Sequence, residues 1–530
     1  MSTCEPPAVD NYSRANVLDP VSRHADATPD NIALRGADST LTYGQLRAAS
    51  TRYAGALTEA GLSPGDRILL AAPSVPEFVV AYLGIQAAGC VVVPVNTMST
   101  RPETEYVLTD AGAALAIVWH ELGPAIAIVW HELGPAIADA AAALHIPVWT
   151  LTPDSASPDT EPAAVAERDR DDTAAILYTS GTTGRPKGAE LTVGNLLSGG
   201  EIGAECSRGS SEDRTGTGLP LFHVFGQASV MMATFTGGGS LTLLARFDPA
   251  AMLALLRRDR LTIMAGVPTM WNAMLHAADG ADSQDFTQLR IAISGGASLP
   301  GEVAREFESH FGCTILEGYG LTETTAFGTF NDIDRGGKIG YTGRAVPRLA
   351  VEARDHDGLA CPPGTVGEVF VKGATVMKGY WNRPSDTAAV LDPDGWLRTG
   401  DLGEIDADGD LRIVDRVKDL IIRGGYNVYP SEVEEVLYTH PDIVEAAVVG
   451  VPDDHYGEEV AAVVATVPGS GLDGAQLTGW ARERLSAYKI PRIVAIVDSL
   501  PKGSTGKILK RSIDRTALRN DALTAEAPER

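Results

Sequence analysis

Short apolar segments alternate along this chain with longer segments of helical periodicity, and this alternation limits the possible folds. Runs rich in apolar and β-branched residues lie at 68–72, 91–95, 174–178, 289–294 and 368–372. Segments such as 43–62 and 250–260 place apolar residues at helical spacing. The alternation predicts parallel sheets flanked by helices, with ligands bound beyond the carboxyl ends of the strands.

The charge of the chain limits the classes of partner. Its 530 residues include 69 acidic and 43 basic side chains, a formal net charge of −26 at pH 7. Such an acidic surface repels polyanions, which argues against nucleic acid or an anionic membrane as the main partner. Residues 415–530 hold 14 basic and 18 acidic side chains, a net of −4, which leaves −22 for the rest. Local cations must therefore hold any anionic ligand, and the C-terminal part is best placed to supply them.

The cysteines indicate the redox environment. There are five of them, an odd number, widely spaced and without a CxxC pair, so neither a disulfide framework nor a zinc site is indicated. Residues 1–10 lack the basic and apolar regions of a secretory signal, and no apolar run reaches the roughly 18 residues of a membrane span. We therefore expect a cytoplasmic protein with reduced thiols and no transmembrane segment.

A turn cluster marks the strongest domain boundary. Asp406, Asp408, Gly409 and Asp410 precede a short predicted strand at 411–414. The chain beyond this strand has the length of a small domain. The sequence therefore predicts an N-terminal domain over 1–414 and a C-terminal domain over 415–530.

An exact tandem duplication lies in the first third of the chain. The eleven residues at 116–126, AIVWHELGPAI, recur without change at 127–137. Two copies are too few for a solenoid, and the spacing of His120 and His131 matches no metal-ligand motif. We expect one copy to fill a strand-then-helix position and the other to bulge at the surface.

One segment carries the strongest chemical signal. Residues 178–188 read YTSGTTGRPKG and follow an apolar run that predicts a strand. Glycines and hydroxyl side chains can surround phosphate oxygens with backbone N–H and O–H donors. The segment differs from a Walker A loop, because Pro186 precedes Lys187 and biases Arg185 away from helix. It predicts a phosphate-binding loop of another kind.

This segment resembles the corresponding loop of the adenylate-forming superfamily of acyl-CoA synthetases, nonribosomal-peptide adenylation domains and luciferases. The resemblance extends from about residue 19 to residue 515 and is strongest to bacterial medium- and long-chain fatty-acid–CoA ligases. It implies an α/β fold: a large N-terminal domain of layered, mostly parallel sheets with helices, and a small α+β C-terminal domain joined by a hinge. It also implies two steps. A carboxylate attacks the α-phosphate of ATP and releases pyrophosphate, then a thiol attacks the acyl-adenylate and releases AMP.

The resemblance assigns nucleotide contacts to five separate segments. Tyr319, in Gly318–Thr324 (GYGLTET), is expected to stack on adenine, and Asp401 and Arg416 are expected to contact the ribose. The residues assigned to ATP or AMP are Thr179, Ser180, Gly181, Thr182, Thr183, Gly184, Lys187, Gly295, Gly296, Ala297, Tyr319, Asp401 and Arg416.

Four residues are assigned to the chemistry by the same resemblance. Thr322 is expected on the α-phosphate side, and Glu323 is expected to hold Mg²⁺, which offsets the repulsion between a carboxylate and a triphosphate. His223, beside Phe225, is expected near the acid's carboxylate. Lys507, within 501–511 (PKGSTGKILKR), is expected to stabilise the negative charge that develops during adenylation.

The second step is assigned to the C-terminal part. Lys418 matches the hinge about which the small domain rotates between the two steps. Gly424, Gly425 and Tyr426 resemble the loop that lines the pantetheine channel of CoA after rotation, with Gly425 as the point of closest approach. The cofactors and substrates implied are ATP, Mg²⁺, CoA and a carboxylic acid.

The acid is less closely defined. The stretches 219–235 and 317–330 contain no Lys or Arg, which disfavours a second carboxylate on the substrate. The apolar side chains in them are expected either to line a tunnel or to belong to the core; they are Phe225, Met231, Met232, Phe235 and Phe327. A fatty acid is our first interpretation and an aryl acid the second.

Two further functions differ in class. An adenylating enzyme could pass its acyl group to a carrier protein without using CoA. A non-catalytic scaffold would not require Lys187, Glu323, Asp401, Arg416 and Lys507 together. The sequence leaves the oligomeric state open, a homodimer included.

Overall fold

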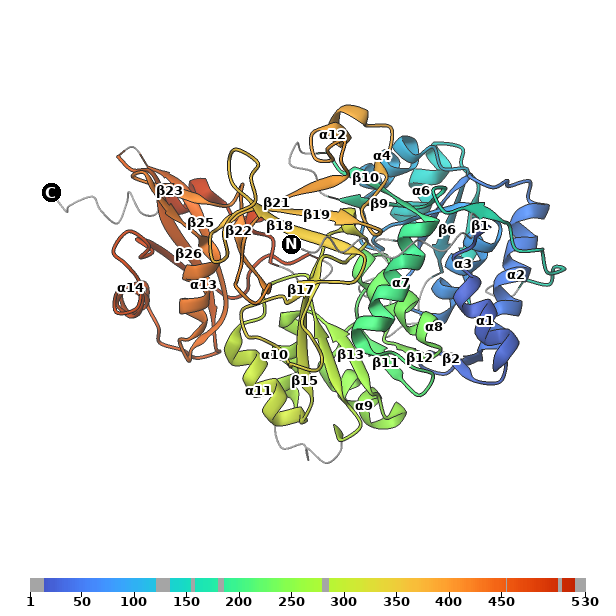
Figure 1. The fold of residues 1–530 in the computed structure, drawn as a ribbon, viewed down its shortest axis with the longest axis horizontal. Helices are drawn as coiled ribbons and strands as arrows, with labels where there is room; N and C mark the ends of the chain where they lie inside the picture. The colour runs from blue at the N-terminus through green and yellow to red at the C-terminus, as the bar shows by residue number, and fades with distance from the viewer. Residues whose placement is uncertain are drawn as a thin grey trace, which may run out of the picture.

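The computed structural model describes residues 14–120, 134–153, 158–179, 185–278, 286–453, 455–503 and 508–519. Two large mixed sheets with helices around them form most of the molecule, and a smaller unit with its own sheet lies at one end (Figure 1). None of the described helices is long and apolar enough to cross a membrane. The predicted α/β class, with a large N-terminal and a small C-terminal part, is confirmed.

The first large sheet has seven strands. Its central strands pair in parallel, whereas β9, β10 and β20 pair antiparallel at one edge. In spatial order the strands are β20 (Gly379–Tyr380), β10 (Lys187–Thr192), β9 (Thr173–Thr179), β5 (Val91–Pro94), β4 (Arg67–Ala71), β6 (Leu115–Trp119) and β7 (Val148–Leu151).

The second large sheet has nine strands. Six of them run in parallel, and short antiparallel strands close both edges. In spatial order they are β17 (Arg344–Ala345), β16 (Thr329–Phe330), β15 (Thr314–Tyr319), β14 (Ile291–Ser294), β13 (Ile263–Gly266), β11 (Arg214–Thr217), β12 (Ser240–Leu243), β2 (Ile32–Arg35) and β3 (Thr40–Thr42).

Helices pack on and between these sheets. In the N-terminal part they are α1 (Asp19–Ala27), α2 (Tyr43–Glu59), α3 (Pro76–Ala87), α4 (Arg101–Ala111), α6 (Gly134–Ala143), α7 (Val193–Ser207), the π-helix η1 (Phe225–Met232), α8 (Ala233–Gly237), α9 (Pro249–Asp259), α10 (Pro268–Ala277), α11 (Gly301–Phe311), the 3₁₀ turn η3 (Thr322–Thr324) and α12 (Pro384–Ala388). Helix α3 is apolar and buried on all sides, as expected of a helix enclosed in a core. The largest apolar cluster joins α3 and α7 to strands of both sheets.

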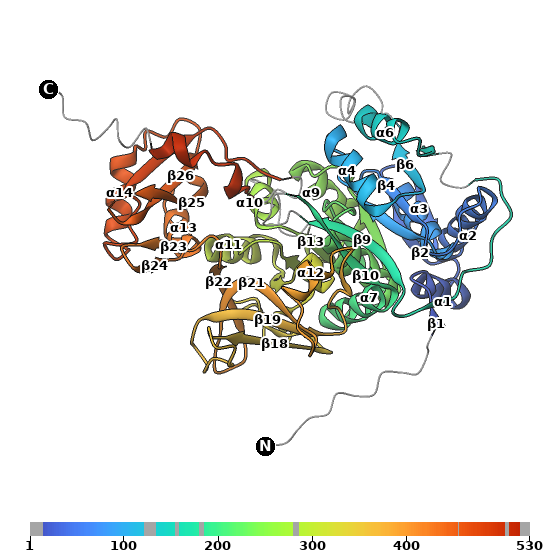
Figure 2. The ribbon, with the colours of Figure 1, turned by 90° about the horizontal axis from the view of Figure 1, so that it is seen from above.

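Two further sheets follow, the first antiparallel and the second mixed. Strands β18 (Leu349–Arg354), β19 (Gly367–Gly373), β21 (Trp396–Ile405) and β22 (Leu411–Arg416) form a four-stranded sheet beside the two large ones (Figure 2). The C-terminal unit, which we define as residues 417–519, contains β23 (Ile421–Arg423), β24 (Tyr426–Val428), β25 (Ile443–Asp453), β26 (Gly457–Thr466) and β27 (Ile493–Val497). Its helical elements are α13 (Pro430–Tyr438), α14 (Gly474–Arg482) and η4 (Lys510–Ser512). A further two-stranded pair joins β1 (Arg14–Ala15) to β8 (Arg168–Asp169).

The strands predicted from sequence lie close to the observed ones. Strands β4, β5, β9, β14 and β19 cover the five predicted runs to within two residues at each end. Strand β22, however, extends through Arg416, two residues beyond the predicted domain boundary, because Asp401 and Leu402 of β21 pair with Arg416 and Asp415.

The duplication contributes both of its copies to regular structure. Strand β6 takes four of its five residues, 116–119, from the first copy, whereas α6 begins at Gly134, which lies in the second copy. The expectation that a single copy supplies both strand and helix is therefore wrong. Residues 121–133, which include His131, lie outside the described residues.

Removal of residues 127–137 tests this interpretation of the duplication. The deletion leaves one AIVWHELGPAI, so the strand residues, a three-residue connection and the helix start all remain. We expect the protein to fold and to gain about 1 kcal/mol, because shortening the connection from residues 120–133 lowers the entropy cost of loop closure. Thermal and urea unfolding of both chains measure the change. A loss of stability of several kcal/mol would show that the second copy is needed for packing.

Candidate active site

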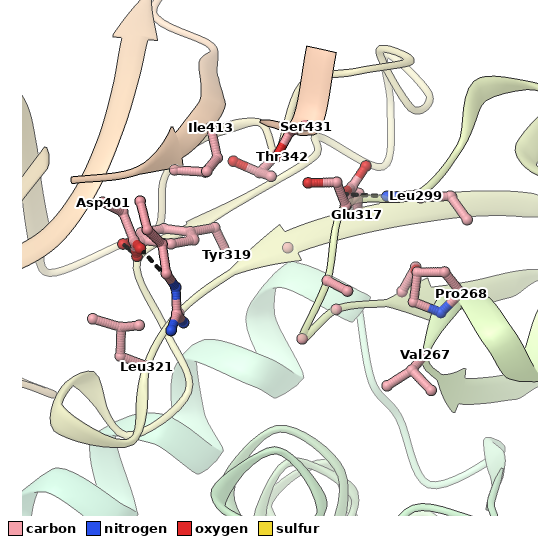
Figure 3. A pocket seen from close by; sticks show the side chains of 18 of the residues that line it. Val267, Pro268, Leu299, Glu317, Tyr319, Leu321, Thr342, Asp401, Ile413 and Ser431 are labelled. Carbon is pink, nitrogen blue, oxygen red and sulfur yellow. Dashed lines mark hydrogen bonds and ion pairs between the residues drawn. The ribbon is translucent and has the colours of Figure 1, made fainter. Parts of the chain in front are cut away.

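A large cleft lies where the carboxyl ends of several strands meet the C-terminal unit. Its volume is about 2280 Å³. Strand β15, the loop after β14, the first half of β21 and helix α13 all contribute lining residues (Figure 3). The expected position of a ligand, beyond the carboxyl ends of parallel strands, thus coincides with this cleft.

The predicted phosphate-binding loop connects the antiparallel strands β9 and β10. Thr179 ends β9 and pairs with Lys187, the first residue of β10. A strand therefore follows the loop, which agrees with its distinction from a Walker A loop. Thr179 and Lys187 line the cleft, whereas Ser180, Gly181, Thr182, Thr183 and Gly184 lie outside the described residues.

Lys187 is the cation at the base of this loop. Its Nζ lies 2.7 Å from Asp386 Oδ1, and its side chain is only 12% exposed. The ammonium also lies 5.3 Å from the ring centroid of Tyr380. This pairing lowers the pKa of the Asp386 carboxyl. An anion that approached Lys187 would compete with Asp386 for it.

Glu323 lies on the short turn η3 and contacts Tyr380, whose ring lies close to Lys187. The Tyr380 hydroxyl donates to Glu323 Oε1 at 2.9 Å, and Thr179 Oγ1 lies 3.4 Å from the same oxygen. Burial, with the nearby Glu323 carboxylate, raises the pKa of Tyr380, so this hydroxyl stays a donor. Thr322 precedes Glu323 and also lines the cleft.

Tyr319, Asp401 and Arg416 join three segments at one point. The Tyr319 hydroxyl donates to Asp401 Oδ2 at 2.7 Å, and Arg416 Nε lies 3.3 Å from Asp401 Oδ1 (Figure 3). Asp401 is only 4% exposed, and these partners offset the cost of burying its carboxylate. The structure therefore brings together the three residues assigned to adenine and ribose.

The loop after β14 forms an adjacent wall of the cleft. Gly295, Gly296 and Ala297 all line it. Gly296 has φ +79°, a left-handed conformation that favours glycine, and a side chain on Gly295 would approach the Phe225 ring to 3.3 Å. These three residues thus face the same space as Tyr319.

His223 lies just before the π-helix η1 and lines the cleft with Phe225 and Gly226. The Phe225 backbone N–H donates to His223 Nδ1 at 3.3 Å, which leaves Nε2 to carry the proton of the neutral imidazole. Of the other apolar residues predicted there, Phe327 lines the cleft. Met231, Met232 and Phe235 are buried and belong to the core rather than to the cleft lining.

The C-terminal unit presents one of its two predicted functional segments to the cleft. Lys507 lies outside the described residues, but Gly503 and Ile508 on either side of it line the cleft. Lys418 lies on the exposed connection at the cleft's edge. The hairpin of Gly424, Gly425 and Tyr426 is not among the lining residues, and Tyr426 is 61% exposed and stacks on Tyr488.

Three residues of the site were not identified from sequence: Tyr380 and Glu317, which line the cleft, and Asp386, which pairs with Lys187. Tyr380 and Asp386 come from the segment 379–388, which has no recognisable motif, and their roles appear only once Lys187 and Glu323 are placed. Glu317 directly precedes the Gly318–Thr324 motif and could have been noticed as a charge within an apolar strand.

Glu317 is a buried carboxyl at the edge of the cleft. It is 7% exposed, and one of its oxygens accepts a hydrogen bond from the Leu299 backbone N–H at 3.1 Å (Figure 3). Burial raises the pKa of Glu317 from 4.5 to about 8. The side chain is therefore mostly protonated at neutral pH and holds the end of the loop that carries Gly295–Ala297.

Replacement of Glu317 by Gln has a defined pH dependence. Because the pKa of this acid is higher in the folded than in the unfolded chain, folding costs more free energy as the pH rises from about 4.5 to 8, and the cost is constant above 8. Glu317→Gln keeps an acceptor for Leu299 and removes that cost. We expect the variant to be more stable than the parent by a few kcal/mol at pH 8, with the difference vanishing below pH 5. Urea unfolding at several pH values measures it, and a difference independent of pH would contradict this assignment.

Comparisons with known proteins agree with this geometry. The AMP-binding enzyme family matches residues 21–381, and the AMP-binding enzyme C-terminal domain matches residues 432–507. A feruloyl-CoA synthase from Amycolatopsis sp. is 38% identical over 498 residues, 93% of this chain and 97% of that protein. A long-chain-fatty-acid–CoA ligase from Bacillus subtilis is 36% identical over 521 residues, 92% of this chain and 91% of that protein.

A solved structure extends the comparison to the whole fold. ATP-bound MatB from Rhodopseudomonas palustris superimposes with a TM-score of 0.87 at 35% identity, over 96% of this chain and 100% of that one. Three observations indicate the same family: the residues that line the cleft, the two family matches and the relatives that align over nearly their full length. The chain belongs to the AMP-binding enzyme family and is an ATP-dependent, AMP-forming acid–CoA ligase.

Proposed function

We propose that this ligase activates a medium- or long-chain fatty acid and transfers the acyl group to CoA. One observation carries the choice of acid: the part of the cleft lining that comes from α7, η1 and Phe327, which we call the apolar arm, contains no cation. The residues that line this arm are Gly203, Cys206, Ser207, Phe225, Gly226, Ser229 and Phe327. Among these described residues there is no Lys or Arg to pair with a second carboxylate, whereas apolar and small side chains suit a hydrocarbon.

The proposal assigns the triphosphate to the β9–β10 loop and Lys187. Lys187 would leave Asp386 for the phosphates, since a charge-assisted bond to phosphate replaces the one to the carboxylate. Glu323 fits a magnesium ligand, because Mg²⁺ is commonly bound through one or two carboxylates, substrate phosphates and water. The Tyr380 hydroxyl holds one Glu323 oxygen in place, and such support orients a metal ligand.

The nucleoside is assigned to the opposite wall. Tyr319 would stack on adenine against Gly295–Ala297, and Asp401 and Arg416 would contact the ribose. The carboxylate of the acid would lie near His223, at the mouth of the apolar arm. An oxygen of that carboxylate would then attack the α-phosphate and release pyrophosphate, with Lys507 and Thr322 beside the developing charge.

The second step is assigned to a different orientation of the C-terminal unit, with Lys418 as its hinge. The thiol of CoA would attack the acyl carbon, with AMP as leaving group. Gly425 has φ +84° and open space around the position of a Cβ, which suits a close approach to pantetheine. The four described cysteines are free thiols, which fits the cytoplasmic location that we propose.

An aryl acid is the second candidate substrate, because a feruloyl-CoA synthase is 38% identical to this chain. Transfer to a carrier protein instead of CoA is the alternative for the acceptor. Incubation of the purified protein with ATP, Mg²⁺ and either palmitate or ferulate, with and without CoA, distinguishes these functions. We expect palmitoyl-CoA, AMP and pyrophosphate in equal amounts. Acyl-AMP that persists in the presence of CoA would contradict the proposal that CoA is the acceptor. A preference for ferulate would contradict the proposal that the substrate is a fatty acid.

The apolar arm can be tested separately by Cys206→Phe. Cys206 lies on α7 and lines the arm, so a phenyl ring there would fill space needed by a long acyl chain. We expect kcat/KM for palmitate to fall ~10-fold or more, the loss that about 1.4 kcal/mol of binding energy produces. Butyrate is the internal control, because a short chain does not reach that far. An equal loss with both acids would show that this arm does not hold the acyl chain.

A further inference from the structure

The cation proposed to hold the phosphates, Lys187, is paired with an anion of the chain itself. Its Nζ lies 2.7 Å from Asp386 Oδ1, the distance of a charge-assisted hydrogen bond. Asp386 lies on the short helix α12, 199 residues further along the chain, and is not among the residues that line the cleft. The pair therefore draws the ammonium toward α12, whereas the proposed triphosphate would lie in the cleft.

The surroundings of Lys187 make Asp386 and a phosphate alternative partners. The lysine side chain is 12% exposed, and the ring centroid of Tyr380 lies 5.3 Å from Nζ. Among the residues that the structure describes, Asp386 is the one carboxylate that pairs with Lys187. Two anions that share one largely buried ammonium repel each other, so a phosphate that binds Lys187 displaces Asp386.

Arg383 allows Asp386 to release Lys187 without losing every partner of its own. Its Nη1 lies 3.6 Å from Asp386 Oδ2, the carboxylate oxygen that Lys187 does not use. The Tyr106 hydroxyl holds Arg383 in place: it accepts from Nη2 at 2.7 Å and donates to the Pro186 carbonyl at 2.8 Å. A cation therefore stays beside Asp386 when the ammonium turns into the cleft, which lowers the free-energy cost of the exchange.

The competition concerns the β- and γ-phosphates and not the nucleoside. In the proposed site, the nucleoside lies against Tyr319, Asp401 and Arg416. The outer phosphates lie at Lys187, and they leave together as pyrophosphate when the acyl-adenylate forms. Asp386 is then able to pair with Lys187 again, which opposes the return of pyrophosphate.

We propose that Asp386 is a tethered competitor of the triphosphate: it weakens the binding of ATP and of pyrophosphate at Lys187 by similar factors and thereby favours pyrophosphate release. A cation that is paired with an internal anion most of the time shows a lower apparent affinity for any ligand that needs it. Asp386 is thus a positioning residue, which acts through Lys187 and not on the reacting atoms. The inference rests on the proposed function, in which Lys187 holds the phosphates of ATP.

Asp386→Asn tests the competition by equilibrium binding. The replacement keeps the shape of the side chain and removes its charge. Without an acid present, so that no adenylate forms, we expect the Kd of Mg·ATP and the Kd of pyrophosphate each to fall ~10-fold. The Kd of AMP should stay within about threefold of the parent, because AMP has no outer phosphate for which Asp386 competes. Isothermal titration calorimetry measures all three.

Steady-state kinetics of the same variant give a second measurement. The KM for ATP and the inhibition constant of pyrophosphate should fall together, each ~10-fold, because both ligands compete with Asp386 for one cation. The kcat should not rise, since the substitution changes no contact to the reacting atoms. A changed kcat with an unchanged KM for ATP would contradict the competition.

Asp394→Asn is the matched control. Asp394 lies in an exposed turn after α12 and is not paired with Lys187, so this variant loses the same charge without freeing the ammonium. We expect its affinities for Mg·ATP, pyrophosphate and AMP to stay within about threefold of the parent. Equal tightening in Asp394→Asn and Asp386→Asn would replace the competition by a general effect of the negative charge of the protein.

A double-mutant cycle with Lys187→Ala completes the test. The gain in ATP affinity from Asp386→Asn should largely disappear in that background, because the cation for which Asp386 competes is absent. An equal gain in both backgrounds, unchanged ATP affinity in Asp386→Asn, or weaker ATP binding in Asp386→Asn would each overturn the proposal. Failure of the proposed function is distinguishable, because Lys187→Ala would then leave Mg·ATP binding unchanged both with and without Asp386→Asn.

Discussion

The hydrogen bond and ion pair that meet at Asp401 hold the centre of this structure. Asp401 lies on the four-stranded sheet, Tyr319 ends a strand of the nine-stranded sheet, and Arg416 is the last residue of β22 before the C-terminal unit. A carboxylate with 4% exposure is costly to bury unless it is paired, so this position is stable only when all three segments are in place. The cleft is therefore defined by a polar interaction that itself depends on the complete fold.

Other charged side chains of the cleft are also paired with a residue of opposite charge. The chain carries a large negative charge, and Lys187 is held by Asp386 while Lys510 is held by Glu434. In our proposal the Lys187–Asp386 pair opens when the phosphates of ATP bind to Lys187. A carboxylate thus holds each of these two cations in place.

The sequence predicted the positions of strands and helices more closely than the pairing of charged side chains. Strand β5 and helix α9 could be located because burial on a sheet and on one helix face leaves periodic patterns. The resemblance placed Tyr319, Asp401 and Arg416 in one site, and the structure brings them together. Asp386, Glu434 and Lys510 were not identified, because their partners lie 199 or 76 residues away along the chain and such pairs leave no local pattern.

The strand and helix taken from different copies of the duplication were likewise beyond prediction. Identical residues occur in both copies, so no local signal could decide which copy each element would use. The roles of the individual cleft residues are part of the proposal, and all of them depend on the adenylation step.

Exchange of labelled pyrophosphate into ATP tests that step most directly, because the label enters ATP only if an acyl-adenylate forms reversibly. The account predicts exchange that requires both a fatty acid and Mg²⁺, that proceeds without CoA, and that disappears in Asp401→Ala. A folded protein that binds ATP but exchanges no label with any fatty or aryl acid would contradict it.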